Sequence, residues 1–225
     1  MSSVTRRALI GLAQLFLALA FLLFVTAWSL HYFQAWWYLG IFGICVSAIT
    51  IYLMRNDPEL LERRLDAGPL AEKERSQQVI QAFAAAAFVA LYVVSALDFR
   101  FHWSYVDPFM VEIGDLLVVA GLGIIFAVFK ENSYASATIE AVEEQQLIRT
   151  GPYAFVRHPM YLGALVMLLG TPPALLSWWG ECAVIVIVGV IVWRLLKEEE
   201  FLVKNLPGYE EYKRKVKWRL LPGIF

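Results

Sequence analysis

Polar and aromatic side chains gather where the chain enters one of its apolar stretches. Residues 151–163 include Tyr153, Arg157, His158 and Tyr161. Ionisable groups are costly in a bilayer unless they are paired, so such a cluster at the edge of an apolar stretch indicates a functional site. The alternative interpretation makes Arg157 and His158 snorkelling anchors and the tyrosines part of an interfacial aromatic belt. The residue types alone give the two interpretations equal weight.

A second polar cluster follows the last apolar stretch. Arg194 and Glu198 are four residues apart, so on a helix they lie on one face, and Glu199 and Glu200 follow directly. The alternative is an ordinary ion pair on a helix surface, which stabilises by only about 0.3–0.5 kcal/mol. If the two clusters meet, they form a pocket at one membrane face that is open to the cytosol.

A pocket lined by carboxylate, imidazole, guanidinium and phenol groups favours group transfer between two bound partners. The sequence has no GxGxxG loop and no evident nucleophile–base pair, which argues against hydride transfer and covalent catalysis. Cys45 and Cys182 both lie in apolar stretches, so we expect no disulfide framework, no zinc site and no other metal. Outside the short C-terminal tail no basic stripe is interleaved with aromatic residues, so nucleic-acid binding is not expected.

The motifs in and around both clusters resemble those of the isoprenylcysteine carboxyl methyltransferases and their prokaryotic relatives. That family shares the pattern RHPxYxG, then EExxL, then YxxY near the end of the chain. The likeness covers roughly residues 132–222 and is weaker in residues 56–63. The matching segments, which occur in the same order and spacing, are Gly151-Pro152-Tyr153, Arg157 to Gly163, Glu198 to Leu202, and the pair Tyr209 and Tyr212.

The resemblance implies S-adenosylmethionine as the cofactor, held without a Rossmann fold between the RHPxY segment and the helix after the last span. It also implies that Glu198 binds the cationic amino end of this cofactor. The other implied cofactor-binding residues are Gln145, Leu147 and Ile148 on the adenine side, together with Tyr153, His158, Pro159 and Tyr161. The sequence departs from the family pattern nearby, with Glu140 where the family often has Gln and Gln145 where it has His.

Arg194 is implied by the same resemblance to bind the methyl acceptor and, with Glu198, to be a catalytic residue. A guanidinium can hold a carboxylate through two parallel hydrogen bonds and aim it at the sulfonium methyl group. A carboxylate is ionised at pH 7, so its methylation needs no general base, and approximation and desolvation must supply the rate. The resemblance therefore predicts an enzyme that methylates a carboxylate of isoprenylcysteine type on a lipophilic acceptor.

Other functions stay open on the sequence alone. Within methyl transfer, the acceptor could be a phospholipid amine or another small lipid methylated on nitrogen or sulfur, and an amine would need a base such as Glu198 or Glu199. A membrane reductase that uses NADPH is a second class, because sterol reductases have distantly similar C-terminal hairpins. A non-enzymatic transporter is a third class, although transporters place paired charges near the midplane rather than at one membrane face.

The elements that must position these residues are membrane helices. Apolar residues make up 60% of the 225 residues and charged residues 17%, and the mean hydropathy is +0.60, which does not suit a soluble globule. A helix needs about 20 apolar residues to cross a bilayer, and six segments approach or reach that length. The expected fold is therefore all-α and polytopic, with about six transmembrane helices and a cytosolic C-terminal cofactor pocket. The segments are 8–30, 33–54, 79–97, 109–129, 159–176 and 181–196.

Positive charge is distributed unevenly between alternate loops. With six spans, 18 of the 19 Lys and Arg residues fall on one side and only Arg100 falls on the other. The positive-inside rule then places both termini in the cytosol. The lack of a eukaryotic-style extension favours a prokaryotic cytoplasmic membrane over the endoplasmic reticulum. The expected partners are the lipophilic acceptor and membrane lipids.

The last two spans are shorter than the others and are joined by the brief turn 177–180, while Pro172 and Pro173 interrupt the first of them. This pattern predicts a short helical hairpin that brings both polar clusters to the same membrane face. We therefore expect an N-terminal four-span region over residues 1–130 and a C-terminal methyltransferase region over residues 131–225. The charged segment 55–78 is expected to be a cytosolic connector with a short surface helix.

Overall fold

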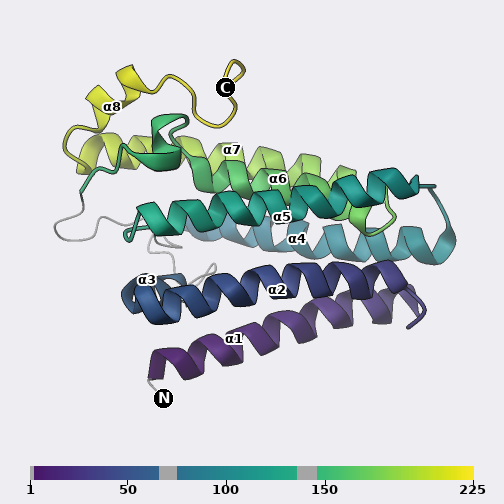
Figure 1. The fold of residues 1–225 in the computed structure, drawn as a ribbon. Helices are drawn as coiled ribbons and strands as arrows, with labels where there is room; N and C mark the ends of the chain where they lie inside the picture. Colours follow the sequence, from purple (N-terminus) through teal and green to yellow (C-terminus); the bar gives the residue numbers. More distant parts are fainter. Residues whose placement is uncertain (1–2, 66–74, 136–145) are drawn as a thin grey trace.

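The computed structural model describes residues 3–65, 75–135 and 146–225, and every regular element within these ranges is a helix (Figure 1). The all-α prediction is thus confirmed for the described residues. In chain order the elements are α1 (Ser3–Ala20), continued by a π-helical turn (Phe21–Val25), α2 (Phe33–Asn56), α3 (Pro58–Leu65), α4 (Arg75–Phe101), α5 (Pro108–Glu131), a 3-10 turn (Gly151–Ala154), α6 (Pro159–Ala174), α7 (Gly180–Asn205) and α8 (Tyr209–Lys215).

The long helices match the predicted membrane spans in part. Within the described residues, four helices are long and apolar enough to cross a membrane, and they correspond to the first four predicted spans: α1 with its π-helical turn, α2, α4 and α5. α6 is a shorter apolar helix of 16 residues. α7 has 26 residues and continues to Asn205 instead of ending at residue 196, because the charged run after Arg194 extends the same helix. The chain is an integral membrane protein, and crossing by α6 and α7 stays a prediction.

α5 packs along α6 so closely that glycines occupy the points of contact. They are Gly114 and Gly121 on α5, and Gly163 and Gly170 on α6. A Cβ atom added to Gly114 would lie 2.6 Å from the backbone nitrogen of Ala174, and one added to Gly163 would lie 2.8 Å from the carbonyl oxygen of Gly121. Small residues let membrane helices approach closely where lipid supplies no hydrophobic driving force. This packing fixes the first turn of α6, which carries Tyr161.

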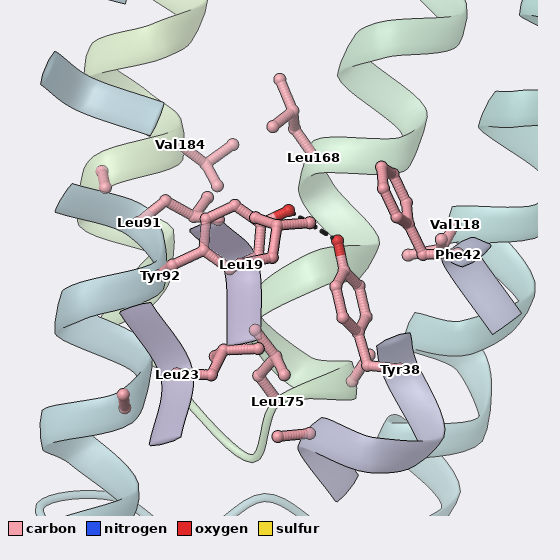
Figure 2. Packing of buried hydrophobic residues seen from close by; sticks show 14 of the residues in the cluster. Leu19, Leu23, Tyr38, Phe42, Leu91, Tyr92, Val118, Leu168, Leu175 and Val184 are labelled. Atoms are coloured by element: carbon pink, nitrogen blue, oxygen red, sulfur yellow. Dashed lines mark hydrogen bonds between the residues drawn. The ribbon is translucent and has the colours of Figure 1, made fainter. Parts of the chain in front are cut away.

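The main core lies where α1, α2, α4, α5, α6 and α7 meet, and it consists largely of leucines and aromatic rings (Figure 2). Tyr38 and Tyr92 are fully buried in this core, and their hydroxyl oxygens are 2.7 Å apart. The hydroxyl of Thr171 lies 3.3 Å from that of Tyr38. The three hydroxyl groups satisfy one another, as buried polar groups must where water is absent. They tie α2 and α4 to α6.

A buried carboxylate holds the turn between α6 and α7. Asp98, near the end of α4, is fully buried. It accepts hydrogen bonds from the Ser104 hydroxyl at 2.7 Å, the Ser104 N–H at 2.8 Å, the Ser177 hydroxyl at 2.7 Å and the Trp179 N–H at 3.3 Å. Four donors offset the cost of removing the carboxylate from water. Because Ser177 and Trp179 lie in the turn, Asp98 fastens the predicted hairpin to α4.

α3 lies at the other end of the bundle, beside the ends of α1 and α2 (Figure 1). Asp57 precedes it and accepts a hydrogen bond from the Leu60 N–H at 2.9 Å, which satisfies one of the first N–H groups of the helix. Leu60 and Leu61 are buried in a small core with residues of α1, α2 and α5. The short helix expected in the connector is therefore present, but one of its faces is apolar and buried. The alternating charges of the segment had indicated a helix on the surface.

Candidate functional site

A cavity of about 560 Å³ lies at the α3 end of the bundle. Its lining residues come from α3, α4, α5, α6, α7, α8 and the segments before α6. The volume is within the range of about 300–1,000 Å³ that is usual for small-molecule sites. The C-terminal helices thus build most of the wall, and α3 and α4 complete it.

The cavity brings the two predicted polar clusters together. Glu140 and Gln145 lie outside the described residues, so the structure says nothing about these two positions. All other predicted site residues line the cavity: Leu147, Ile148, Tyr153, His158, Pro159, Tyr161, Arg194 and Glu198. Their convergence agrees with the predicted hairpin, whereas the role of each residue stays a prediction.

Glu199 is the buried centre of the charged groups beside the cavity. Its Oε1 atom is 3.0 Å from Arg157 Nη1 and 3.4 Å from His158 Nε2, and its Oε2 atom is 3.0 Å from Arg219 Nε. Burial by itself would raise the pKa of Glu199, but hydrogen bonds from His158 and Arg219 and the charge of Arg157 lower this pKa to about 2. Glu199 therefore stays ionised at neutral pH and fixes three side chains.

The C-terminal tail pairs with the segment that carries His158. The Arg157 N–H donates to the Trp218 carbonyl at 2.9 Å, and the His158 N–H donates to the Arg219 carbonyl at 3.0 Å. The tail is itself closed into a turn, because the N–H groups of residues 219–221 all donate to the main-chain oxygen of Phe225. These backbone bonds fix the residue at which α6 begins.

Tyr161 connects the two polar clusters. Its hydroxyl donates to Glu198 Oε2 at 2.5 Å and accepts from Arg194 Nε at 3.0 Å. Gln81 of α4, with its amide oxygen turned toward the guanidinium, accepts from the two terminal nitrogens of Arg194 at 2.9 and 3.3 Å. Glu198 Oε1 is also 3.9 Å from His158 Nδ1. A guanidinium and a carboxylate are thereby held on the same wall of the cavity.

Tyr153 lies in the 3-10 turn before α6 and is tied to two other elements. Its hydroxyl accepts a hydrogen bond from the Asn132 amide at 2.7 Å, and its carbonyl accepts one from the Tyr212 hydroxyl of α8 at 2.7 Å. Burial is the main cause that raises the pKa of Tyr153 to about 12, against the opposing hydrogen bond from Asn132. Tyr153 is therefore a neutral hydrogen-bonding group at physiological pH.

The cavity has an apolar part and a polar part that follow one another along α7. The lining residues of α7 lie on one face in the order Ile187, Ile191, Arg194, Glu198, Phe201 and Leu202. On α4, Gln81 lines the cavity beside Arg194, whereas Ala84, Ala85 and Phe88 continue toward the apolar part. The distance along a helix from Ile187 to Glu198 is about 16 Å at 1.5 Å per residue. Arg194 thus lies at the boundary between the two parts.

Several polar lining residues fall outside the predicted set. They include Arg64, Gln81, Asn132 and Tyr209. The sequence does contain a signal that could have identified Gln81 as a site residue, because an amide inside a predicted apolar span needs a hydrogen-bond partner. No such signal marks Arg64, because it lies among alternating charges in the segment interpreted as a connector. Tyr209 belongs to the YxxY motif, but no role was attached to it.

Residues 109–207 match the protein-family model described as phospholipid methyltransferase. This part of the chain is similar to that family. The family region contains α5, α6 and α7 and so carries His158, Tyr161, Arg194 and Glu198. Arg64 precedes the family region.

A curated relative is the protein-S-isoprenylcysteine O-methyltransferase of Schizosaccharomyces pombe. It is 32% identical over 80 residues, which are 33% of this chain and 32% of the relative. The chain therefore matches about a third of that protein's length. No solved structure matches the chain significantly. The predicted resemblance to this group of membrane methyltransferases is confirmed by the family model and the relative together.

Proposed function

We propose that this chain transfers the methyl group of S-adenosylmethionine to a carboxylate of isoprenylcysteine type on a lipophilic acceptor. The observation that carries the proposal is the order of groups along one cavity wall. Ile187 and Ile191 line the apolar part, Arg194 follows at its boundary, and Glu198 lies beyond it. A lipid tail, its anionic head group and a cationic cofactor can be held in that order.

The polar part of the cavity fits S-adenosylmethionine by its donor and acceptor groups. Glu198 can pair with the amino group of the cofactor, and Leu147 and Ile148 offer apolar surface to its adenine ring. Tyr209 is 3% exposed, and its hydroxyl has no hydrogen-bond partner among the described residues. An unpaired buried hydroxyl costs about 1–3 kcal/mol, so a bound ligand with an acceptor atom there would be stabilised. When bound, the cofactor supplies an electrophilic methyl group.

The residues of the chain act by orientation and by excluding water. Tyr161 and Gln81 hold the Arg194 guanidinium in place. Arg194 can therefore bind the carboxylate of the acceptor in one fixed orientation. Well-oriented intramolecular reactions reach effective molarities of roughly 10⁵–10⁸ M. A dry cavity also favours a reaction in which opposite charges are neutralised. No proton has to be removed, because a carboxylate is already ionised at pH 7.

A phospholipid amine is the second candidate acceptor, since the matching family model is described as phospholipid methyltransferase. An ammonium group must lose a proton before it can be methylated, so this reaction needs a base. Glu199 is unsuited to that role because its pKa is lowered to about 2 and both its oxygens are occupied. Glu198 is the remaining carboxylate among the described residues that line the cavity.

The cavity is proposed to face the cytosol of a prokaryotic cell. The start of α1, α3 and α8 lie at the same end of the bundle as the cavity (Figure 1). Most Lys and Arg residues belong to these segments and their neighbours, and the positive-inside rule assigns such an end to the cytosol. This orientation gives the site access to S-adenosylmethionine from water and to the acceptor from lipid.

Calorimetric titration of the purified protein with S-adenosylmethionine tests the cofactor assignment. The variant is Glu198→Gln, and the matched control is Glu200→Gln, whose carboxylate is exposed and pairs with Lys197 at 2.9 Å. We expect the wild type and Glu200→Gln to bind equally. Glu198→Gln should bind about tenfold more weakly, because the amino group of the cofactor loses a charge-assisted hydrogen bond. A wild type without measurable binding contradicts the proposal.

Membranes incubated with methyl-labelled S-adenosylmethionine then distinguish the acceptors. A methyl ester releases its label in mild base, whereas N-methyl and S-methyl products retain it. We expect base-labile label in a lipophilic product. Base-stable label would overturn the carboxylate acceptor and favour the amine.

A further inference from the structure

The C-terminal tail, residues 216–225, turns back from α8 and packs beside α6 and α7 (Figure 1). Leu220 is buried in a small apolar cluster with Leu165 of α6 and Leu195 of α7. Phe225 packs against the same cluster. The tail is therefore joined to the membrane helices by its own apolar side chains, in addition to its backbone bonds with the segment before α6.

The packing of α5 along α6 places this cluster at membrane depth. Leu165 is two residues after Gly163, the glycine of α6 that contacts Gly121 of α5. α5 is one of the helices long and apolar enough to cross a membrane, and Gly121 lies well inside it. Because Leu220 packs against Leu165, the tail extends from α8 to the level of an apolar span.

The backbone of the tail suits that depth, because its N–H groups are bonded within the turn. Those of residues 219–221 donate to the main-chain oxygen of Phe225, and those of Ile224 and Phe225 donate to the Leu221 carbonyl. Backbone groups that lack water must be satisfied internally. The turn can therefore contact lipid without leaving these donors unpaired.

The exposed side chains of this turn include three large apolar ones. Ile224 is 78% exposed, Leu221 42% and Trp218 38%. Removing apolar surface from water stabilises by about 25 cal/mol per Å², and tryptophan is enriched where membrane meets water. A lipid surface thus suits these side chains better than water does.

Exposed cations directly precede the apolar turn. Arg214, Lys215 and Lys217 are exposed, and the acidic residues of α8 lie in its first turn, whereas the basic ones lie in its last. Basic residues followed by apolar ones form the pattern of an interfacial anchor, which lays its apolar side in the membrane and its cations among the head groups. An anionic membrane surface strengthens binding by about fivefold for each basic residue near it.

We propose that the last turn of α8 and the tail form an anchor that binds the anionic surface of the membrane, and that this binding strengthens the site. The carbonyls of Trp218 and Arg219 accept hydrogen bonds from the N–H groups of Arg157 and His158. A tail that is fixed by lipid therefore also fixes His158. The anchor itself does not depend on the chemistry of the site, whereas its effect on cofactor affinity rests on the proposed function.

Hydrogen exchange of the tail amides, followed by mass spectrometry, tests the anchor. The protein is placed in nanodiscs of phosphatidylcholine alone or of equal parts phosphatidylcholine and phosphatidylglycerol. The variant is the double substitution Arg214→Gln and Lys217→Gln. The matched control removes the same charge through Arg6→Gln and Arg55→Gln, both exposed residues of α1 and α2, which lie across the bundle from the tail (Figure 1). Exchange of α5 peptides reports whether each protein is folded.

We expect the tail amides of the wild type and of the control to exchange about tenfold more slowly in the anionic nanodiscs than in the neutral ones. The tail variant should exchange at the same rate in both. High salt should remove most of the difference in the wild type, because it screens exposed charges. Equal exchange of the wild-type tail in the two nanodiscs overturns the anchor, and so does an equal loss of protection in the control.

Ile224→Asp tests the apolar half of the anchor, with Ile224→Leu as the matched control. A carboxylate is costly to place in lipid, so Ile224→Asp should speed exchange of the tail in both nanodiscs, whereas Ile224→Leu should behave as the wild type. If Ile224 faces water, Ile224→Asp changes nothing, and that result contradicts the anchor.

Calorimetry with S-adenosylmethionine in the same nanodiscs tests the effect on the site. We expect the wild type to bind about threefold more tightly in the anionic nanodiscs, and the Arg214 and Lys217 variant to bind equally in both. Equal binding by the wild type, with its tail protected by anionic lipid, overturns the link between anchor and site. A protected tail without any cofactor binding supports the anchor and contradicts the proposed methyl transfer.

Discussion

Asp98 and Glu199 are both buried carboxylates, one toward each end of the bundle, and their partners differ in kind. Asp98 accepts hydrogen bonds from two serine hydroxyls and two backbone N–H groups. Glu199 accepts from two guanidiniums and an imidazole. One carboxylate is satisfied by neutral donors in a turn, and the other by two guanidiniums and an imidazole beside a cavity.

This difference separates a carboxylate that stabilises the fold from one that organises a site. Asp98 fastens the α6–α7 turn to α4, and neither it nor its donors line the cavity beside Glu198. Two of the partners of Glu199, namely Arg157 and His158, do line that cavity. A buried carboxylate therefore indicates a functional site only where the groups that it fixes also reach a space for a ligand.

Glu199→Gln has the largest expected effect. Removal of the charge leaves Arg157 buried without its counter-charge, and breaking a buried ion pair typically costs about 3–5 kcal/mol of stability. We also expect about tenfold weaker binding of S-adenosylmethionine, because His158 loses the group that positions it. Urea unfolding in detergent measures the stability, and calorimetry measures the binding. Unchanged cofactor affinity would make Glu199 a purely structural group like Asp98.

The pH dependence of stability tests the electrostatic part of this contrast. The pKa of Glu199 is lowered from its ordinary value of 4.5 to about 2 in the folded protein. A carboxylate with a lowered pKa contributes stability that is complete above its unfolded pKa and is lost as the pH falls toward its folded pKa. Between pH values of about 5 and 2, the unfolding midpoint of the wild type should therefore fall more steeply than that of Glu199→Gln. Parallel curves would contradict the lowered pKa.

Asp98→Asn tests the other member of the pair. The amide keeps the size of the carboxylate but replaces one acceptor oxygen with a donor, so hydrogen bonds from Ser104, Ser177 or Trp179 are lost. We expect the free energy of unfolding to fall by about 1–3 kcal/mol, as when a buried hydrogen-bonding group is left unsatisfied. The affinity for S-adenosylmethionine should stay within about twofold of the wild type. A tenfold loss would show that the hairpin turn controls the distant site.

The sequence predicted the convergence of the two clusters because a short connection leaves few alternatives. Two apolar segments joined by four residues must pack as a hairpin, which brings His158 near Glu198. The first four spans were predictable from hydropathy alone. These inferences depend on local pattern and on chain connectivity, both of which are visible in a sequence.

The separate environments of Glu198, Glu199 and Glu200 could not be predicted. A helix turns by about 100° per residue, so three successive identical side chains point to three different surroundings. Glu198 lines the cavity, Glu199 is buried, and Glu200 is exposed. Which of them is buried depends on where the C-terminal tail and Arg157 pack. The position of Arg64 depends in the same way on the burial of α3 against other helices.

Arg219→Gln should have the smallest effect of these substitutions on stability and on cofactor affinity. The Arg219 side chain is 33% exposed, and Glu199 keeps Arg157 and His158 when it is removed. We expect a loss of at most about 1 kcal/mol in stability and two- to threefold in cofactor affinity. A double-mutant cycle with Glu199→Gln tests whether Arg219 acts through its ion pair with Glu199. If it does, Arg219→Gln should have almost no further effect once the carboxylate is gone. Additive losses would instead show that Arg219 acts independently of Glu199. Its side chain would then support the site by making the backbone of the tail more rigid.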